Sequence, residues 1–111
     1  MNDFEGPEFL VYGPGSFYTP HLDASADAST ESRRVSVVLF LNAESKEPAP
    51  DIYCGGSLTF HGLMDGPFKK CAFSLEADAG LLIAFRSSTL HEVRPVTAGQ
   101  RYSVVGWFTG D

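Results

Sequence analysis

Three side chains that could bind a metal ion stand out in the sequence, namely His21, Asp23 and His91. His21 and Asp23 are two residues apart in a segment, Phe17 to Asp23, that we expect to be extended, so both side chains should point to the same side. Two imidazoles and one carboxylate suit iron(II) and leave coordination positions open on the opposite face. The same three ligands also form a zinc site with one open position, so the donors alone leave the metal undecided.

Arg101 is a fourth candidate, because it lies inside a predicted strand, Gln100 to Phe108. Two-residue periodicity places it on the face that also carries Ser103, Val105 and Trp107, and this largely apolar face should point inward. A buried guanidinium is costly unless it meets an anion. A small-molecule carboxylate would pair with it through two hydrogen bonds, and Ser103 could donate a third. The alternative is an arginine on a twisted edge strand that reaches solvent.

The elements that must position these residues are short strands. The sequence predicts strands at Arg33 to Leu41, Cys71 to Leu75 with one buried face, Leu81 to Phe85 and Gln100 to Phe108. Glycine and proline interrupt every window in which an amphipathic helix could form. We therefore expect an all-β fold with few or no helices, an antiparallel sandwich or barrel of which the jelly roll is the leading form. Residues 24–32 and 42–51 read as loops, either solvated connectors or flaps over a site.

Composition limits the function classes. With 111 residues, 43% of them hydrophobic, residues 1–111 are expected to form a single domain. The formal charge of −6 and the scattered basic residues argue against a nucleic-acid partner. The longest aliphatic or aromatic run, Leu81 to Phe85, is too short for a membrane span, and the first residues carry no export signal, so we expect a cytoplasmic protein. Cys54 and Cys71 form no CxxC motif and imply no disulfide.

Taken in order, the candidates and their flanking sequences resemble the iron(II)- and 2-oxoglutarate-dependent dioxygenases, in particular the prolyl-4-hydroxylase-like group. The resemblance covers roughly residues 9 to 109. Its ordered set of motifs is far more specific than any single piece. The matching stretches are Tyr12 to Asp23, Arg34 to Asn42, Gly55 to Leu58, Gly80 to Phe85, His91 to Val96, and Gly99 to Trp107.

The resemblance implies a double-stranded β-helix, the jelly roll of this family, with His21, Asp23 and His91 as the iron ligands. It implies that Arg101 anchors the far carboxylate of 2-oxoglutarate, that Ser103 is the second member of an Arg-x-Ser pair, and that the Tyr12 hydroxyl lines the cosubstrate pocket. No catalytic residue beyond the metal ligands is implied. Tyr18 and Trp107 are expected to pack around the site, and His61 matches no ligand position.

The activity that the resemblance implies needs iron(II), 2-oxoglutarate and dioxygen, and whether ascorbate is also required is left open. It would convert 2-oxoglutarate to succinate and carbon dioxide while hydroxylating a prolyl-type substrate, which is a peptide, a protein or a free amino acid. Two other functions stay open: a cupin-like zinc or other metal enzyme, and a non-catalytic module that binds a metal or a carboxylate. Because the family usually has helices before its first strand, we expect either a shortened enzyme or a larger sheet that packs on another subunit as a homo-oligomer.

Overall fold

The structure is a computed structural model that describes residues 3–24, 30–63 and 71–110. In these residues the chain forms strands and no helix, as the interrupted hydrophobic pattern predicts. None of these residues belongs to a helix that could cross a membrane. The strands are β1 (Asp3–Tyr12), β2 (Tyr18–His21), β3 (Arg33–Phe40), β4 (Ala43–Glu44), β5 (Ile52–Gly55), β6 (Leu58–His61), β7 (Ala72–Leu75), β8 (Leu82–Arg86), β9 (Leu90–Val93), β10 (Val96–Ala98) and β11 (Arg101–Thr109).

The larger sheet has the strand order β1-β11-β3-β8, and every neighbouring pair in it is antiparallel. Its central strands β3 and β11 are rich in β-branched and aromatic residues, which favour a half-buried pleated surface. The register places Ser103 opposite Phe40 and Trp107 opposite Ser36. All four of these side chains are buried, so they share the inner face of the sheet.

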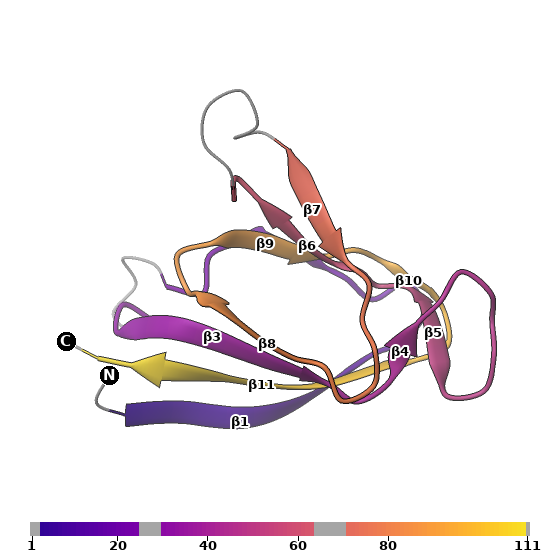
Figure 1. Ribbon diagram of the computed structural model, residues 1–111, viewed down its shortest axis with the longest axis horizontal. Coiled ribbons are helices and arrows are strands. Elements are labelled where there is room, and N and C mark those ends of the chain that lie inside the picture. Colours follow the sequence, from indigo (N-terminus) through magenta and orange to yellow (C-terminus); the bar gives the residue numbers. More distant parts are fainter. Residues whose placement is uncertain (1–2, 25–29, 64–70, 111) are drawn as a thin grey trace.

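A second antiparallel sheet, of order β2-β9-β6-β7, faces the larger one, and the space between the two sheets holds the interior of the protein (Figure 1). A smaller sheet, β10-β5-β4, lies at one end and includes the parallel pair of β4 and β5. Strands that are distant in the sequence therefore become neighbours. In particular, β2 pairs with β9, and this pairing sets His21 opposite His91.

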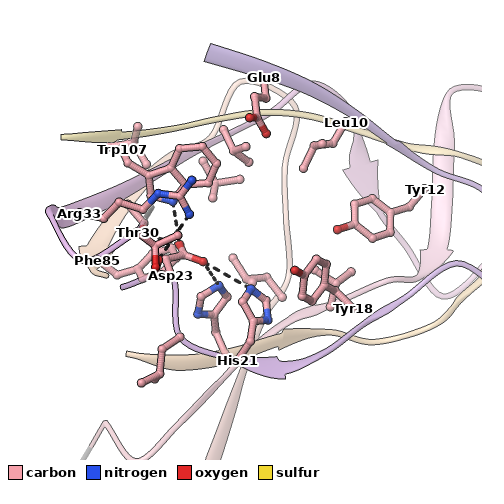
Figure 2. Close-up of a pocket in the computed structure, with 18 of the residues that line it drawn as sticks. Glu8, Leu10, Tyr12, Tyr18, His21, Asp23, Thr30, Arg33, Phe85 and Trp107 are labelled. Atoms are coloured by element: carbon pink, nitrogen blue, oxygen red, sulfur yellow. Dashed lines mark hydrogen bonds and ion pairs between the residues drawn. The ribbon is translucent and has the colours of Figure 1, made fainter. Parts of the chain in front are cut away.

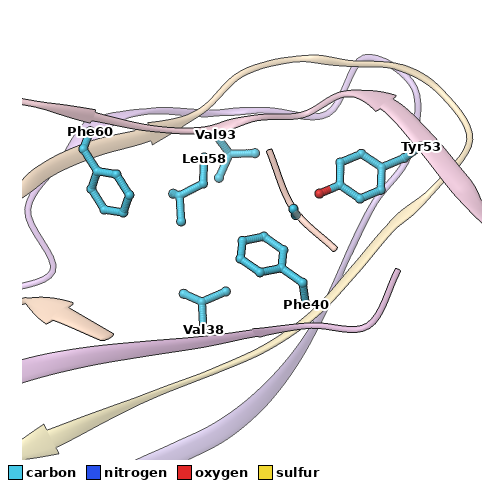
Figure 3. Close-up of a cluster of buried hydrophobic side chains, with 7 residues drawn as sticks. Val38, Phe40, Tyr53, Leu58, Phe60 and Val93 are labelled. Carbon is cyan, nitrogen blue, oxygen red and sulfur yellow. The ribbon is translucent and has the colours of Figure 1, made fainter. Parts of the chain in front are cut away.

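The hydrophobic core lies between the two sheets (Figure 3). Phe60 packs edge-on against Phe85, with ring centroids 5.0 Å apart, which is a favourable geometry for aromatic pairs. Inward alternation on β3 and β6 supplies much of the rest, because residues two apart face the same side of a strand. The buried members of the core are Val38, Phe40, Tyr53, Leu58, Phe60, Ala77 and Val93.

Two glycines allow β5 and β10 to approach closely. Gly55 and Gly99 have positive φ angles of 70° and 72°, a region that residues with a side chain rarely adopt. A Cβ atom at Gly55 would lie 2.5 Å from the Pro95 carbonyl oxygen, and one at Gly99 would lie 2.3 Å from the Ile52 carbonyl oxygen. Neither position therefore accepts a larger residue without movement of the backbone.

The outer face of the larger sheet is apolar and uncovered in the described structure. Phe9 is 61% exposed and Leu82 is 63% exposed, and both lie on the face opposite the core. Phe4 and Phe108 contact each other edge-on there, with ring centroids 4.9 Å apart. We call this surface the outer apolar face; it comprises Phe4, Phe9, Val11, Leu82 and Phe108.

Two predictions about local structure need correction. The predicted buried face of the strand at 71–75 is wrong, because Phe73 is 54% exposed and Cys71 is also exposed, while Leu75 packs against the core. β7 pairs only with β6, so an edge strand was mistaken for a buried one. The predicted loop at 42–51 contains the short strand β4, and the other predicted loop lies partly outside the described residues.

Candidate metal and cosubstrate site

A cavity of about 430 Å³ opens between the two sheets. The inner faces of β1, β3 and β11 form one wall, and residues of β2 and β9 form the opposite wall (Figure 2). Five of the six residues predicted for the site line this cavity, and the sixth, Ser103, contacts one of them. The five lining residues are Tyr12, His21, Asp23, His91 and Arg101.

The three predicted metal ligands meet at one end of the cavity. His21 ends β2, Asp23 follows two residues later, and His91 lies on β9 directly opposite His21. One potential ligand atom from each residue lies within 4.8 Å of those of the other two. Nε2 of His21 is 3.4 Å from Oδ1 of Asp23, and Nε2 of His91 is 3.2 Å from the same oxygen. The sheet pairing thus brings together donors that are 70 residues apart in the chain.

Backbone carbonyls orient both imidazoles in the same way. Nδ1 of His21 lies 2.7 Å from the Thr19 carbonyl oxygen, and Nδ1 of His91 lies 2.8 Å from the Thr89 carbonyl oxygen. A carbonyl oxygen can only accept a hydrogen bond, so each Nδ1 carries the proton. In the neutral ring Nε2 then has a free electron pair directed toward Asp23, as a metal ligand requires.

Asp23 uses its two carboxylate oxygens differently. Oδ2 accepts a hydrogen bond of 2.5 Å from the Ser36 hydroxyl and one of 3.0 Å from the Trp107 indole N–H. Oδ1 is left facing the two imidazoles. Ser36 is held in turn by the Ser87 hydroxyl, 2.9 Å away, and the Ser87 carbonyl accepts the backbone N–H of Asp23. These hydrogen bonds fix Oδ1 as the oxygen of Asp23 that points into the site.

The electrostatics of the cluster favour a positive charge beside the Asp23 carboxylate, either a proton on a ring or a metal ion. Burial raises the pKa of Asp23, but the closeness of the His21 and His91 rings and the hydrogen bond from Ser36 outweigh it and hold the pKa well below its usual range. Burial lowers the pKa of His21, while the neighbouring Asp23 carboxylate and the Thr19 carbonyl raise it more, so the net shift is upward and a proton competes with a metal ion for Nε2. Nitrogen and carboxylate donors around one point, with the carboxylate ionised, fit a divalent metal such as iron(II).

An arginine that the sequence did not single out braces this end of the cavity. The Arg33 guanidinium lies 3.8 Å from the centre of the Trp107 ring and forms an ion pair with Glu5 on β1. The hydrogen bond to Arg33 lowers the pKa of Glu5, so the pair is ionised at neutral pH. Arg33 therefore clamps the indole that in turn holds Asp23. The pairing of β3 and β11 creates this contact, and nothing in the local sequence signals it.

At the other end of the cavity lies Arg101, which is only 2% exposed. Its Nη1 donates to the Ser103 hydroxyl at 3.2 Å, and its guanidinium lies 5.1 Å from the Tyr12 ring centre. Its Nε has no hydrogen-bond partner among the described residues, and no carboxylate there forms an ion pair with it. A buried cation that lacks an anion is the condition under which a ligand carboxylate binds favourably.

The remaining predicted neighbours also fall into place. Tyr18 packs against His21, with ring centroids 4.0 Å apart, and Trp107 lines the cavity. The sequence predicted that Trp107 would pack around the site, but its indole N–H also holds Asp23. His61 lies outside the cluster and contacts Glu92 at 2.6 Å. No other group of metal-binding side chains occurs in the part of the chain that the structure describes.

Comparison with known proteins decides the family. The model of the 2OG-Fe(II) oxygenase superfamily, where 2OG is 2-oxoglutarate, matches residues 7–109. The chain belongs to this superfamily. Its members use iron(II), 2-oxoglutarate and dioxygen, so the chemistry expected from the resemblance is that of the family to which the chain belongs.

Within the 2OG-Fe(II) oxygenases, the chain is similar to proteins named PKHD-type hydroxylases. The chain is 40% identical over 98 residues to a PKHD-type hydroxylase of Maricaulis maris, covering 86% of this chain and 38% of that protein. It is 38% identical over 102 residues to a PKHD-type hydroxylase of Synechococcus elongatus, covering 89% and 40%. The chain thus spans about 40% of the length of these relatives.

A solved 2OG-Fe(II) oxygenase has the same fold. The crystal structure of a Pseudomonas putida prolyl-4-hydroxylase superposes with a TM-score of 0.76 at 38% sequence identity. The superposition covers 99% of this chain and 54% of that one. The predicted double-stranded β-helix is therefore confirmed.

Proposed function

We propose that this chain is the oxygenase domain of a hydroxylase that acts on a prolyl-type substrate with iron(II), 2-oxoglutarate and dioxygen. One observation carries the proposal. A single cavity has His21, Asp23 and His91 at one end and an unpaired, buried Arg101 at the other. A metal and a dicarboxylic 2-oxo acid would satisfy both ends together. A zinc hydrolase leaves Arg101 without a role.

In this proposal Nε2 of His21, Nε2 of His91 and Oδ1 of Asp23 would hold the iron. Bound iron(II) supplies the ability to activate dioxygen with the electrons released when the 2-oxo acid loses carbon dioxide. The chain's own contribution is to fix the three donors on one face. Ser36 and Trp107 donate hydrogen bonds to Oδ2 of Asp23, so Oδ1 is the oxygen that would be available to a metal.

Arg101 and Ser103 would hold the far carboxylate of 2-oxoglutarate. The guanidinium can donate two parallel hydrogen bonds, and its free Nε supplies a donor that no described residue uses. Tyr12 lies beside the guanidinium and lines the same cavity, so its hydroxyl can contact the cosubstrate. The apolar walls between the two ends, which include Val38, exclude water from the bound acid.

The prolyl-type substrate is inferred from the names of the relatives. Leu10, Tyr18 and Leu22 line the cavity, and Tyr18 and Leu22 are also exposed, so an apolar group could contact them from solvent. A pyrrolidine ring presents carbon atoms of this kind. Peptide, protein and free amino-acid substrates all fit this description. That residues 1–111 form one domain and that the protein is cytoplasmic stay predictions.

The experiment is an anaerobic titration of the chain with iron(II) and 2-oxoglutarate, followed by admission of oxygen. We expect 2-oxoglutarate to bind only when metal is present, and succinate to form after oxygen enters, faster with proline-containing peptides. Binding of metal and acid without succinate would indicate the non-catalytic module instead. Binding of metal with no affinity for 2-oxoglutarate would refute the assignment of Arg101.

A further inference from the structure

Near the Arg101 end of the cavity there are more buried polar groups without a hydrogen-bond partner than the proposed cosubstrate site uses. Among the described residues, three buried side-chain atoms lack a hydrogen-bond partner: Arg101 Nε, Tyr53 Oη and Glu44 Oε1. Buried polar groups in folded proteins are nearly always hydrogen-bonded, so each exception asks for an explanation. The explanation for Arg101 is a ligand. Tyr53 and Glu44 belong to no motif of the sequence analysis.

Tyr53 lies close to Arg101. It is fully buried on β5, and its hydroxyl points into the interior on the side of Phe40 (Figure 3). The Arg101 guanidinium lies 5.2 Å from the centre of that same Phe40 ring. Burial raises the pKa of Tyr53 to about 12, and the Arg101 guanidinium acts against this rise through its positive charge and through its contact with the hydroxyl. The hydroxyl therefore keeps its proton and is a hydrogen-bond donor.

Donors outnumber acceptors at this end. Arg101, Tyr53 and Ser103 all bring N–H or O–H groups, and Ser103 already accepts from Arg101. The nearby acceptor is Glu44, whose Oε2 is occupied by the Ser57 hydroxyl. No ion pair joins Glu44 to Arg101 among the described residues, so this carboxylate does not take the place of an external anion. A ligand carboxylate has two oxygens and can accept from Arg101 and Tyr53 at once.

We propose that the Tyr53 hydroxyl is a third donor to the far carboxylate of 2-oxoglutarate, alongside Arg101 and Ser103. Arg101 lines the cavity and Tyr53 does not, so we expect the Tyr53 hydroxyl to meet a ligand only where that ligand meets the guanidinium. Tyr53 thus acts on the end of the acid that is remote from the metal. It selects 2-oxo acids that carry a second carboxylate, and this inference rests on the proposed function.

The test compares Tyr53→Phe with the unchanged chain and with Tyr102→Phe. Tyr102 follows Arg101 on β11, but its hydroxyl bonds to Gln100 on the exposed side, so it is a matched control. Manganese(II) replaces iron(II) so that no turnover occurs, and binding is measured by calorimetry. The ligands are 2-oxoglutarate and 2-oxopentanoate, which has the same carbon chain without the far carboxylate.

We expect Tyr53→Phe to weaken 2-oxoglutarate binding about 10- to 100-fold, the range for a hydrogen bond to a charged group. Binding of 2-oxopentanoate should be unchanged, and Tyr102→Phe should bind both acids normally. Equal 2-oxoglutarate affinity in Tyr53→Phe would overturn the inference and leave the proposed function intact. Parallel weakening of both acids would show a structural role and overturn it as well. An unchanged chain that fails to bind 2-oxoglutarate would reject both proposals.

Discussion

Replacing Ser36 with alanine tests whether the hydrogen bonds to Oδ2 of Asp23 prepare the metal site. Ser36 is 1% exposed, and its hydroxyl donates to Oδ2 at 2.5 Å. The substitution removes this bond and the contact with Ser87, but the Trp107 indole still donates to the same oxygen. The carboxylate therefore stays in place and loses part of its orientation.

The expected loss of metal affinity follows from the number of hydrogen bonds to Oδ2 of Asp23 that remain. Loss of a residue that orients a metal ligand typically weakens metal binding about 10- to 100-fold. Because one of the two donors to Oδ2 remains, we expect Ser36→Ala to weaken metal binding about tenfold, near the lower limit of this range. Trp107→Phe should act similarly. The double variant frees Oδ2 entirely, so its loss should exceed the product of the two single losses.

The assay is metal affinity, measured with manganese(II) against a competing chelator. Ser74→Ala is the matched control, since its hydroxyl also bonds another side chain, Thr59 at 2.9 Å, but lies on β7 away from the cavity. We expect the control to bind metal like the unchanged chain. If Ser36→Ala and Ser74→Ala have the same affinity, the orienting role of Ser36 is wrong.

Four further outcomes are expected. Asp23→Ala should abolish metal binding, because two neutral imidazoles hold a labile cation poorly. Elemental analysis measures this, and one metal ion per chain in the variant would show that Asp23 is not a ligand. Arg101→Met should keep its metal but bind 2-oxoglutarate about 100-fold or more weakly in calorimetry, since the paired hydrogen bonds are lost; unchanged affinity would contradict the anchor. Tyr53 has a folded-state pKa of about 12, above the value of about 10 in an unfolded chain, so its stabilising effect is complete below pH 10 and is lost as pH rises through 12. Denaturant unfolding of Tyr53→Phe should therefore show a shallower loss of stability over this window, and parallel curves would refute the assignment. Leu82→Lys should reduce binding of a hydrophobic dye by breaking the outer apolar face, and an unchanged dye signal would show that this face is covered in solution.

Local sequence was sufficient to predict which residues would gather in the candidate site. The His21-x-Asp23 spacing and the inward face of Arg101, Ser103 and Trp107 depend only on the two-residue repeat of a strand, and the described structure places all of them as expected. The resemblance to the 2-oxoglutarate-dependent dioxygenases then gave each of these residues an expected role. Their assignment as ligands of iron and 2-oxoglutarate stays a prediction that the experiments above test.

The supporting contacts could not be predicted in this way, because they depend on which strands become neighbours. Ser36 reaches Asp23 through the pairing of β3 with β8 and β11, and Arg33 reaches Glu5 across the same sheet. Phe73 looked buried because it alternates with polar residues, yet its strand lies at an edge. Register and strand order are global properties, and periodicity within one segment does not contain them.

The strand β11 serves both ends of the cavity. Arg101 and Ser103 project from its beginning and Trp107 from near its end, all on one face. A shift of this strand by one residue would turn the acid anchor and the clamp on Asp23 outward together. The strand thus fixes the spacing between the proposed metal site and the proposed carboxylate anchor. A substitution can change one end alone, whereas a shift of the backbone would change both.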